Sequence, residues 1–234
     1  MKKSGRNTPD SFSQLTLPFT PHQSLDGEDF LEAPCNGEAL AWIDRWPDWP
    51  GPALAVVGPA GSGKSHLARV WAAKCNARFI GIDDLAELME SGDMDTPVVF
   101  DGADRCMGNA NSEQMLFHFL THVQTLRGML LLTGNSAPAR WPVQLPDLAS
   151  RLGAIGVAEI GLPDDGLMGP LLVKLFSDRQ VHVSAEVINF LAARMERSFD
   201  AARCLVAAAD ARALAEGRAV TVPLVRELLA LDAD

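Results

Sequence analysis

The 234-residue chain is long enough for one sizeable domain, or for one domain with a small satellite. Hydrophobic residues make up 47% of it, which excludes wholesale disorder, and no apolar run approaches the roughly 20 residues of a membrane-spanning helix. The formal charge of −10 argues against direct binding to DNA, because a surface that binds the duplex must be basic. We therefore expect a cytoplasmic protein that has no membrane partner and reaches DNA only indirectly.

The chain divides into three stretches of different character. Residues 1–25 are rich in Ser, Thr, Pro and Gln without a helical period, which predicts a flexible arm. Within residues 26–162, short apolar strands alternate with helices, and this α/β pattern predicts a parallel sheet with helices on both faces. Residues 163–234 show only helical patterns and predict a small helical lid domain.

The expected elements follow from apolar runs and their punctuation by Gly and Pro. The predicted strands are 53–57, 78–80, 97–100, 129–133 and 155–160. The predicted helices are 38–46, 64–75, 83–90, 112–126, 165–176, 185–195, 199–215 and 222–231.

A phosphate-binding sequence lies between the strand 53–57 and the helix that starts at Lys64. Residues 58–65 read GPAGSGKS and fit GxxxxGK[ST] in full. Glycines let backbone N–H groups turn toward a phosphate, Lys64 is expected to reach the β- and γ-phosphates, and Ser65 to hold Mg²⁺. The predicted nucleotide-binding residues are Gly58, Pro59, Ala60, Gly61, Ser62, Gly63, Lys64, Ser65, His66 and Asp101.

Asp101 ends a neighbouring apolar strand, where its carboxylate can complete the Mg²⁺ shell beside Ser65. Together the two motifs resemble those of AAA+ nucleotide-binding proteins. Hydrolysing members usually carry a second acid directly after this Asp, but here the next residue is Gly102. Asp104 could substitute only if the turn brought it back. We therefore expect nucleotide binding, with the chain's own ATPase activity weak or absent.

Three further polar residues are candidates for the nucleotide chemistry. Asn135 ends the fourth strand, where it could touch the γ-phosphate or the attacking water; a turn-forming Asn is the alternative. Arg151 could project to a neighbour's nucleotide as an arginine finger, or be a solvated surface residue. Arg197 could fold over the chain's own nucleotide, and Arg203, about one and a half turns later, competes for that role.

Most of the chain resembles the AAA+ module of the bacterial replication initiator DnaA, and more closely the Hda family of shortened DnaA relatives. Residues 29–30 and 35–36 resemble the segment that lines the adenine pocket in that family. Residues 145–152, LPDLASRL, resemble the stretch with its arginine finger, a place that Arg151 takes, and Arg197 matches its second sensor arginine. The resemblance implies ADP or ATP, with Mg²⁺, as the bound cofactor.

One short apolar patch interrupts the predicted arm. Residues 14–19, QLTLPF, resemble the peptide by which bacterial proteins dock on the sliding clamp. Leu17 and Phe19 could each bury an apolar side chain worth about 1.5–3 kcal/mol, and Pro18 restrains the extended backbone. The predicted clamp-binding residues are Gln14, Leu15, Leu17, Pro18 and Phe19.

The resemblance implies a regulator that docks on the DNA-loaded clamp and stimulates hydrolysis of DnaA-bound ATP, which prevents re-initiation of replication. Two alternatives stay open: a helicase-loader-like or clamp-associated ATPase, and a nucleotide-gated adaptor that stimulates no hydrolysis. Also open are self-association through the Arg151 edge, ADP or ATP as the active ligand, and whether Trp42, Trp46 and Trp49 form packing or a binding platform.

Overall fold

The computed structural model describes residues 21–22, 30–92 and 95–231. The predicted clamp-binding residues 14–19 lie outside this described part. Of the predicted arm, Pro21–His22 (β1) is described, and it pairs antiparallel with Phe30–Leu31 (β2). This two-residue pairing attaches the end of the predicted arm next to the segment that leads into the first helix.

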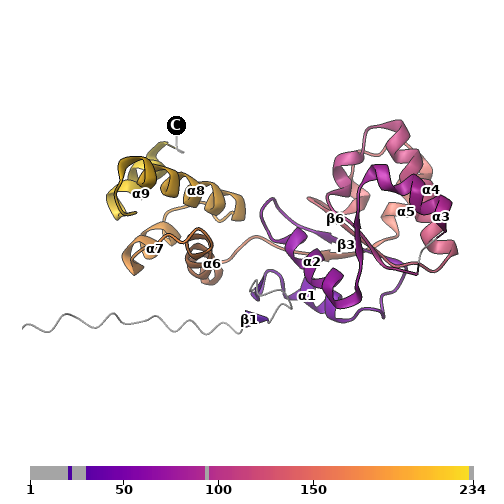
Figure 1. Ribbon diagram of the computed structural model, residues 1–234, viewed down its shortest axis with the longest axis horizontal. Helices are drawn as coiled ribbons and strands as arrows, with labels where there is room; N and C mark the ends of the chain where they lie inside the picture. The colour runs from indigo at the N-terminus through magenta and orange to yellow at the C-terminus, as the bar shows by residue number, and fades with distance from the viewer. Residues whose placement is uncertain (1–20, 23–29, 93–94, 232–234) are drawn as a thin grey trace, which may run out of the picture.

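A parallel sheet of five strands forms the centre of the larger part of the molecule, in the order β4-β5-β6-β3-β7 (Figure 1). Every neighbouring pair in it is parallel, which confirms the predicted sheet class. Its strands are β3 (Ala53–Val57), β4 (Arg78–Ile80), β5 (Val98–Phe100), β6 (Leu130–Gly134) and β7 (Gly156–Glu159).

Helices cover both faces of this sheet, as expected for a parallel sheet. Side chains of alternate β3 residues lie on opposite faces of the sheet. Leu54 and Val56 pack with α1 and α2, whereas Ala55 and Val57 pack with α3, α4 and α5. The helices are α1 (Gly37–Asp44), α2 (Lys64–Cys75), α3 (Leu85–Ser91), α4 (Ala110–Thr125) and α5 (Pro146–Gly153), with the 3₁₀ turns η1 (Ile82–Asp84), η2 (Ala103–Cys106) and η3 (Pro138–Arg140).

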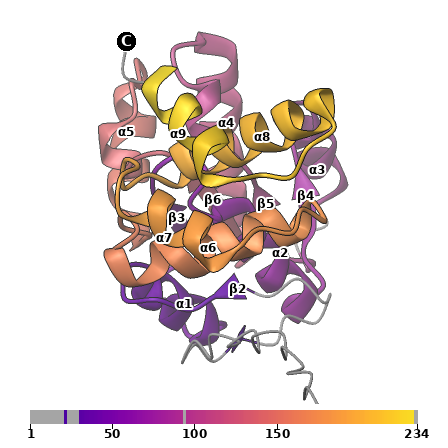
Figure 2. The same cartoon turned by 90° about the vertical axis from the view of Figure 1, so that its left-hand side faces the viewer.

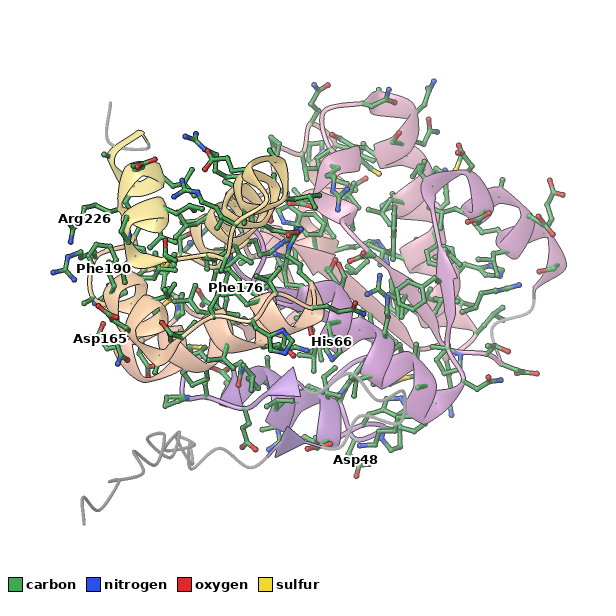
Figure 3. All side chains as sticks on the ribbon, turned by 60° about the vertical axis from the view of Figure 1, so that its left-hand side comes forward. Asp48, His66, Asp165, Phe176, Phe190 and Arg226 are labelled. Carbon is green, nitrogen blue, oxygen red and sulfur yellow. The ribbon has the colours of Figure 1, made fainter. Side chains whose placement is uncertain are left out.

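After β7 the chain forms a separate group of four helices (Figures 1 and 2). These are α6 (Asp165–Asp178), α7 (Ala185–Ala192), α8 (Phe199–Glu216) and α9 (Val222–Leu231). They enclose a core of their own that includes Leu172, Phe176 and Val206. Phe176 is labelled in Figure 3. Among the described residues, none of the helices combines the length and the apolar character that crossing a membrane requires.

Two helices end two or three residues earlier than their sequence patterns predict. The helix predicted at 38–46 stops at Asp44, and Trp46 makes a tighter backbone bond to Ile43 before Pro47, which disfavours a helical residue ahead of it. The helix predicted at 185–195 stops at Ala192. In the sequence the apolar pattern continues past the end of each helix, because side chains of the following turn, such as Trp46 and Met195, still pack against a core.

The tryptophan cluster belongs to the core on the α1–α2 face of the sheet. Trp49 stacks on Trp71 with ring centroids 5.2 Å apart, and Trp46 meets the same ring edge-on at 6.3 Å. The Trp49 indole N–H donates to the Trp42 carbonyl at 2.8 Å. These contacts favour the packing interpretation over a binding platform.

Candidate nucleotide-binding site

Glycines shape the loop between β3 and α2. Gly61 and Gly63 have φ values of 76° and 90°, in the left-handed region that glycine adopts at little cost. Among the described residues, no side chain caps the start of α2, which begins at Lys64. The N–H groups of its first turn are therefore available for a phosphate at the positive end of the helix dipole.

The Lys64 ammonium lies within this loop. Its Nζ donates to the carbonyls of Gly58 and Pro59, both at 2.8 Å, and to Asn135 Oδ1 at 3.3 Å. Burial lowers the pKa of this ammonium, and the carboxylates of Asp104 and Asp101 oppose that shift. The lysine is thus placed where a bound phosphate would replace loop carbonyls as its partner.

Ser65 and Asp101 meet as their sequence motifs predict. The Ser65 hydroxyl donates to Asp101 Oδ1 at 3.0 Å, and the Thr133 hydroxyl donates to the same oxygen at 2.5 Å. One hydroxyl and one carboxylate fit Mg²⁺, which keeps most of its coordination for water and substrate phosphates. These two residues would hold the ion and orient it toward a nucleotide.

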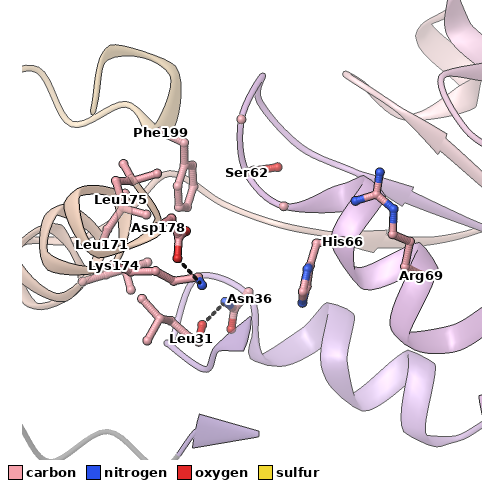
Figure 4. A pocket seen from close by; sticks show the side chains of 13 residues that line it. Leu31, Asn36, Ser62, His66, Arg69, Leu171, Lys174, Leu175, Asp178 and Phe199 are labelled. Atoms are coloured by element: carbon pink, nitrogen blue, oxygen red, sulfur yellow. Dashed lines mark hydrogen bonds and ion pairs between the residues drawn. The ribbon is translucent and has the colours of Figure 1, made fainter. Parts of the chain in front are cut away.

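A cavity of about 500 Å³ opens between the phosphate-binding loop and the lid (Figure 4). Such a volume is typical of small-molecule sites. One wall comes from the loop and α2, one from the segment before α1, and one from lid helix α6 with the first residue of α8. The lining residues are Leu31, Asn36, Gly61, Ser62, Gly63, His66, Arg69, Leu167, Leu171, Lys174, Leu175, Asp178 and Phe199.

The segment before α1 is held rigidly at this cavity. The buried Asn36 side chain accepts from the Ala33 N–H at 2.9 Å and donates to the Leu31 carbonyl at 2.7 Å. The Gly161 N–H donates to the Cys35 carbonyl at 2.7 Å, which ties this segment to the start of the lid. Of the predicted adenine-pocket segment, Asn36 lines the cavity, whereas Asp29 lies outside the described residues.

The two lid arginines that are candidates for the nucleotide chemistry occupy different places. The Arg197 Nε donates to Asp165 Oδ1 at 2.5 Å, within the lid, and Arg197 does not line the cavity. Helix α8 instead presents Arg203 to the phosphate-binding loop: a Cβ on Gly61 would lie 3.3 Å from Arg203 Cδ and 3.2 Å from the Asp200 backbone N. Arg203 does not line the cavity either, but of the two candidates it is the one that lies beside Gly61.

Arg151 lies far from the chain's own phosphate-binding loop. It lines a cavity together with Ala53 and Gly156, the first residues of β3 and β7. The loop follows the other end of β3, so the strand separates the two places by about 16 Å at roughly 3.3 Å per residue. Arg151 is consequently too distant to contact a nucleotide held by the chain's own loop.

Helix α4 supports the Arg151 side chain. The guanidinium lies over the Phe117 ring, 4.9 Å from its centroid, and donates to Gln124 Oε1 at 3.1 Å. The flat guanidinium is well suited to such stacking, which limits the range of positions available to the side chain.

Glu113 fixes the approach to α5 and was not expected from the sequence. Its carboxylate is 1% exposed and accepts from the N–H groups of Gly108, Gln144 and Leu145 at 2.8–2.9 Å. It therefore joins α4 to the start of the helix that carries Arg151. An acidic residue in the first turn of a predicted helix usually signals a favourable dipole contact, so its sequence position hides this role.

Comparison with known proteins agrees with this geometry. Domain III of the replication initiation protein DnaA from Thermotoga maritima superposes with a TM-score of 0.70 at 18% identity, over 87% of this chain and 94% of that one. Residues 171–229 match the family model for the lid domain of Hda. The chain therefore has the AAA+ fold of DnaA domain III, and its C-terminal helices resemble the lid domain of Hda.

Other proteins are also similar to this chain. AMPPCP-bound DnaA from Aquifex aeolicus superposes with a TM-score of 0.58 at 17% identity, over 76% of this chain and 62% of that one. An uncharacterized protein from Haemophilus influenzae is 25% identical over 190 residues, which cover 77% of this chain and 82% of that protein. At these identities the structural likeness establishes the fold, and function requires argument from the site.

Proposed function

We propose that this protein binds an adenine nucleotide, ADP or ATP with Mg²⁺, in the cavity between the phosphate-binding loop and the lid. Gly58–Ser65 would hold the phosphates, with Lys64 on the β- and γ-phosphates and Ser65 and Asp101 on the ion. The base would lie between the Asn36 segment and α6, whose leucines line the cavity. The AMPPCP-bound DnaA of similar fold supports the choice of an adenine nucleotide.

The nucleotide would serve mainly to join the two parts of the molecule. The cavity takes residues from the loop, from the segment before α1 and from α6, so a ligand there bridges sheet and lid. A bound ADP would thereby fix the orientation of the lid, which makes the nucleotide a structural ligand of the regulator.

The regulatory activity we propose is stimulation of ATP hydrolysis in a partner, DnaA, by Arg151. The observation that carries this proposal is the placement of Arg151 at the opposite end of β3 from the chain's own loop, supported by Phe117 and Gln124. An arginine supplied from a neighbour stabilises the charge that develops on the transferred phosphoryl group, and such fingers are worth about 10³–10⁵-fold in rate.

Docking on the sliding clamp through residues 14–19 would bring the protein to its partner. The support is the sequence QLTLPF alone, with Gln14, Leu17 and Phe19 as the anchoring side chains. A tether raises the effective concentration of one AAA+ body near another without requiring new contacts between them. It would also explain how an acidic chain acts on DNA-bound complexes.

The test is single-turnover hydrolysis of ATP pre-bound to DnaA, in the presence of DNA-loaded clamp and the full-length protein. We expect the wild type to accelerate hydrolysis, and Gln14→Ala and Arg151→Ala to remove most of that acceleration. Arg78→Ala, which changes an exposed arginine on β4, is the matched control and should act like the wild type.

The outcomes separate the alternatives. Full activity of Arg151→Ala would indicate a nucleotide-gated adaptor without a finger. Full activity of Gln14→Ala would exclude clamp docking through this peptide. No acceleration by the wild type would overturn the regulatory proposal and leave the AAA+ fold and the cavity.

A further inference from the structure

The backbone directly after Asp101 has a conformation that favours glycine. Gly102 has φ of 73°, and a Cβ built there would lie 2.5 Å from the nearest guanidinium nitrogen of Arg105. The backbone is strained for any residue with a side chain, and the Arg105 guanidinium would also have to move aside. An acid cannot simply be added at the place where hydrolysing AAA+ proteins usually carry one.

The same left-handed turn brings Asp104 back to the end of β6. Gly102 precedes the 3₁₀ turn η2, and from this turn Asp104 Oδ2 accepts from the Asn135 backbone N–H at 2.9 Å and from Asn135 Nδ2 at 3.0 Å. The two bonds orient the amide so that Asn135 Oδ1 faces Lys64 Nζ, 3.3 Å away. A continuous chain of polar groups thus runs from Asp104 through Asn135 to the lysine of the phosphate-binding loop.

The second oxygen of Asp104 is placed to accept a further proton donor. Among the described residues Asp104 Oδ1 has no hydrogen-bond partner, although it is shielded from solvent. Through Asn135 the carboxylate is linked to Lys64, because Asn135 Oδ1 accepts from the Lys64 ammonium at 3.3 Å. Asp104 therefore lies close to where Lys64 would meet a terminal phosphate.

We propose that Asp104 is the catalytic acid–base residue for slow hydrolysis of the chain's own bound ATP, in place of the acid missing at position 102. This rests on the nucleotide binding proposed above and is independent of the partner activity. Asp104 Oδ1 would accept a proton from a water while Asn135 orients that water. The water oxygen forms a bond to the γ-phosphorus, the bond from that phosphorus to the β,γ-bridging oxygen breaks, and ADP leaves with the electron pair.

Such hydrolysis would set the nucleotide state of the protein. ATP captured in the cavity would be converted once to ADP, and the ADP complex would then persist because both the loop and lid helix α6 line the site. The ADP-bound form would be a product of the chain's own chemistry rather than of selective uptake.

The test uses the purified full-length chain with Mg²⁺, without DnaA or clamp. Single-turnover hydrolysis of γ-labelled ATP is measured for wild type, Asp104→Asn, Asp104→Glu and Lys64→Ala, together with the affinity of each for fluorescent ADP and ATP analogues. Asp104→Asn keeps the shape and an acceptor for Asn135 but loses the base, so hydrolysis should slow by about 100-fold. Asp83→Asn, an exposed acid on η1, is the control and should stay within about twofold of wild type.

Three readouts distinguish catalysis from a purely structural role. The proposal requires that Asp104→Asn bind ADP and ATP like the wild type, that Asp104→Glu recover part of the rate, and that the wild type hydrolyse faster than Lys64→Ala. Equal rates for wild type and Asp104→Asn would overturn it, as would a wild type no faster than Lys64→Ala. If the wild type bound neither nucleotide, this inference and the proposed nucleotide function would both fail; if it bound them without Asp104-dependent hydrolysis, only the inference would fail.

Discussion

At the residue scale, the ends of β5 and β6 concentrate charge around one lysine. Asp101 and Asp104, which follow β5, accept hydrogen bonds from different partners. Asp101 accepts from Ser65 and Thr133, and Asp104 accepts twice from Asn135. The Gly102 N–H donates to the Thr133 hydroxyl at 2.7 Å, which fixes the turn between the two acids. This arrangement keeps the two carboxylates on different partners, so that each can serve a different part of a nucleotide.

The first prediction concerns the two lid arginines and nucleotide affinity. Arg203→Ala should weaken ADP or ATP binding by about 10–100-fold, because a charge-assisted bond to phosphate contributes about 1.5–3 kcal/mol. Arg197→Ala should change it by less than about fivefold, because its exposed pair with Asp165 is worth at most about 1 kcal/mol. Titration with a fluorescent ADP analogue measures both.

The reverse order of these two effects would show that the lid rearranges on binding to bring Arg197 over the nucleotide. Arg194→Ala, on the same lid, serves as the control for loss of a surface arginine, since its guanidinium lies over Phe190 at 4.3 Å, away from the cavity.

At the element scale, α4 organises the edge that carries Arg151. It supplies Phe117 and Gln124 beneath the guanidinium, and Glu113 at its first turn binds the backbone ahead of α5. Burial by itself would raise the pKa of the Glu113 carboxyl. The three backbone N–H donors together lower this pKa by more than burial raises it, so the net pKa falls below the ordinary 4.5. The position of α5 thus depends on one buried carboxylate.

The second prediction follows from the hydrogen bonds that the Glu113 carboxylate accepts. Glu113→Gln should lower the free energy of unfolding by about 2 kcal/mol at neutral pH, because an amide group would face a backbone N–H that then lacks an acceptor. A depressed folded-state pKa adds stability that is present above 4.5 and is lost as pH falls through the folded value. The difference between wild type and variant in urea unfolding should therefore shrink below about pH 4.5.

Glu113→Gln should also reduce stimulation of DnaA-bound ATP hydrolysis while leaving ADP affinity unchanged, because α5 is distant from the chain's own cavity. The exposed acid at the start of α3, changed in Glu87→Gln, is the matched control. If the difference in stability between the wild type and Glu113→Gln stayed constant from neutral to acidic pH, the stabilisation would not come from the ionised carboxylate.

At the scale of the whole molecule, the nucleotide cavity exists only because two separately built parts face each other. The sheet and the lid each have a core of their own, and few side chains pack between them other than the small cluster of Ala33, Leu167 and Phe199. Gly61 allows the start of α8 to approach the loop within 3.2 Å of a Cβ position. A ligand that fills the cavity should therefore contribute to stability through both parts.

The third prediction measures that coupling. At ADP concentrations about 100-fold above Kd, binding should add about 2.7 kcal/mol to stability and raise Tm by about 5–10 °C. Amide hydrogen exchange should slow both in residues 61–66 and in α6. Lys64→Ala should lose both effects, and protection confined to the loop would show that the lid does not close on the ligand.

The features that could be predicted from the sequence alone are those that depend on residues close together in the chain. The strand–loop–helix order around Lys64, the alternation of apolar strands with helices, and the change to helices after residue 163 all depend on short-range patterns. The pairing of Ser65 with Asp101 was also accessible, because parallel strands bring their carboxyl ends to one edge. These features were therefore predicted correctly in kind, with helix ends displaced by a few residues.

The tertiary structure decided what depends on the direction of a side chain across a distance. Arg203 rather than Arg197 meets the loop because α8 starts against Gly61, and that packing leaves no sequence signal. Asp104 returns to Asn135 because Gly102 adopts a left-handed turn, and Glu113 reaches Gln144 from 31 residues away. Sequence patterns specify which residues are apolar and where the chain can bend, whereas the partner of a polar group is chosen by the packing of elements far apart in the chain.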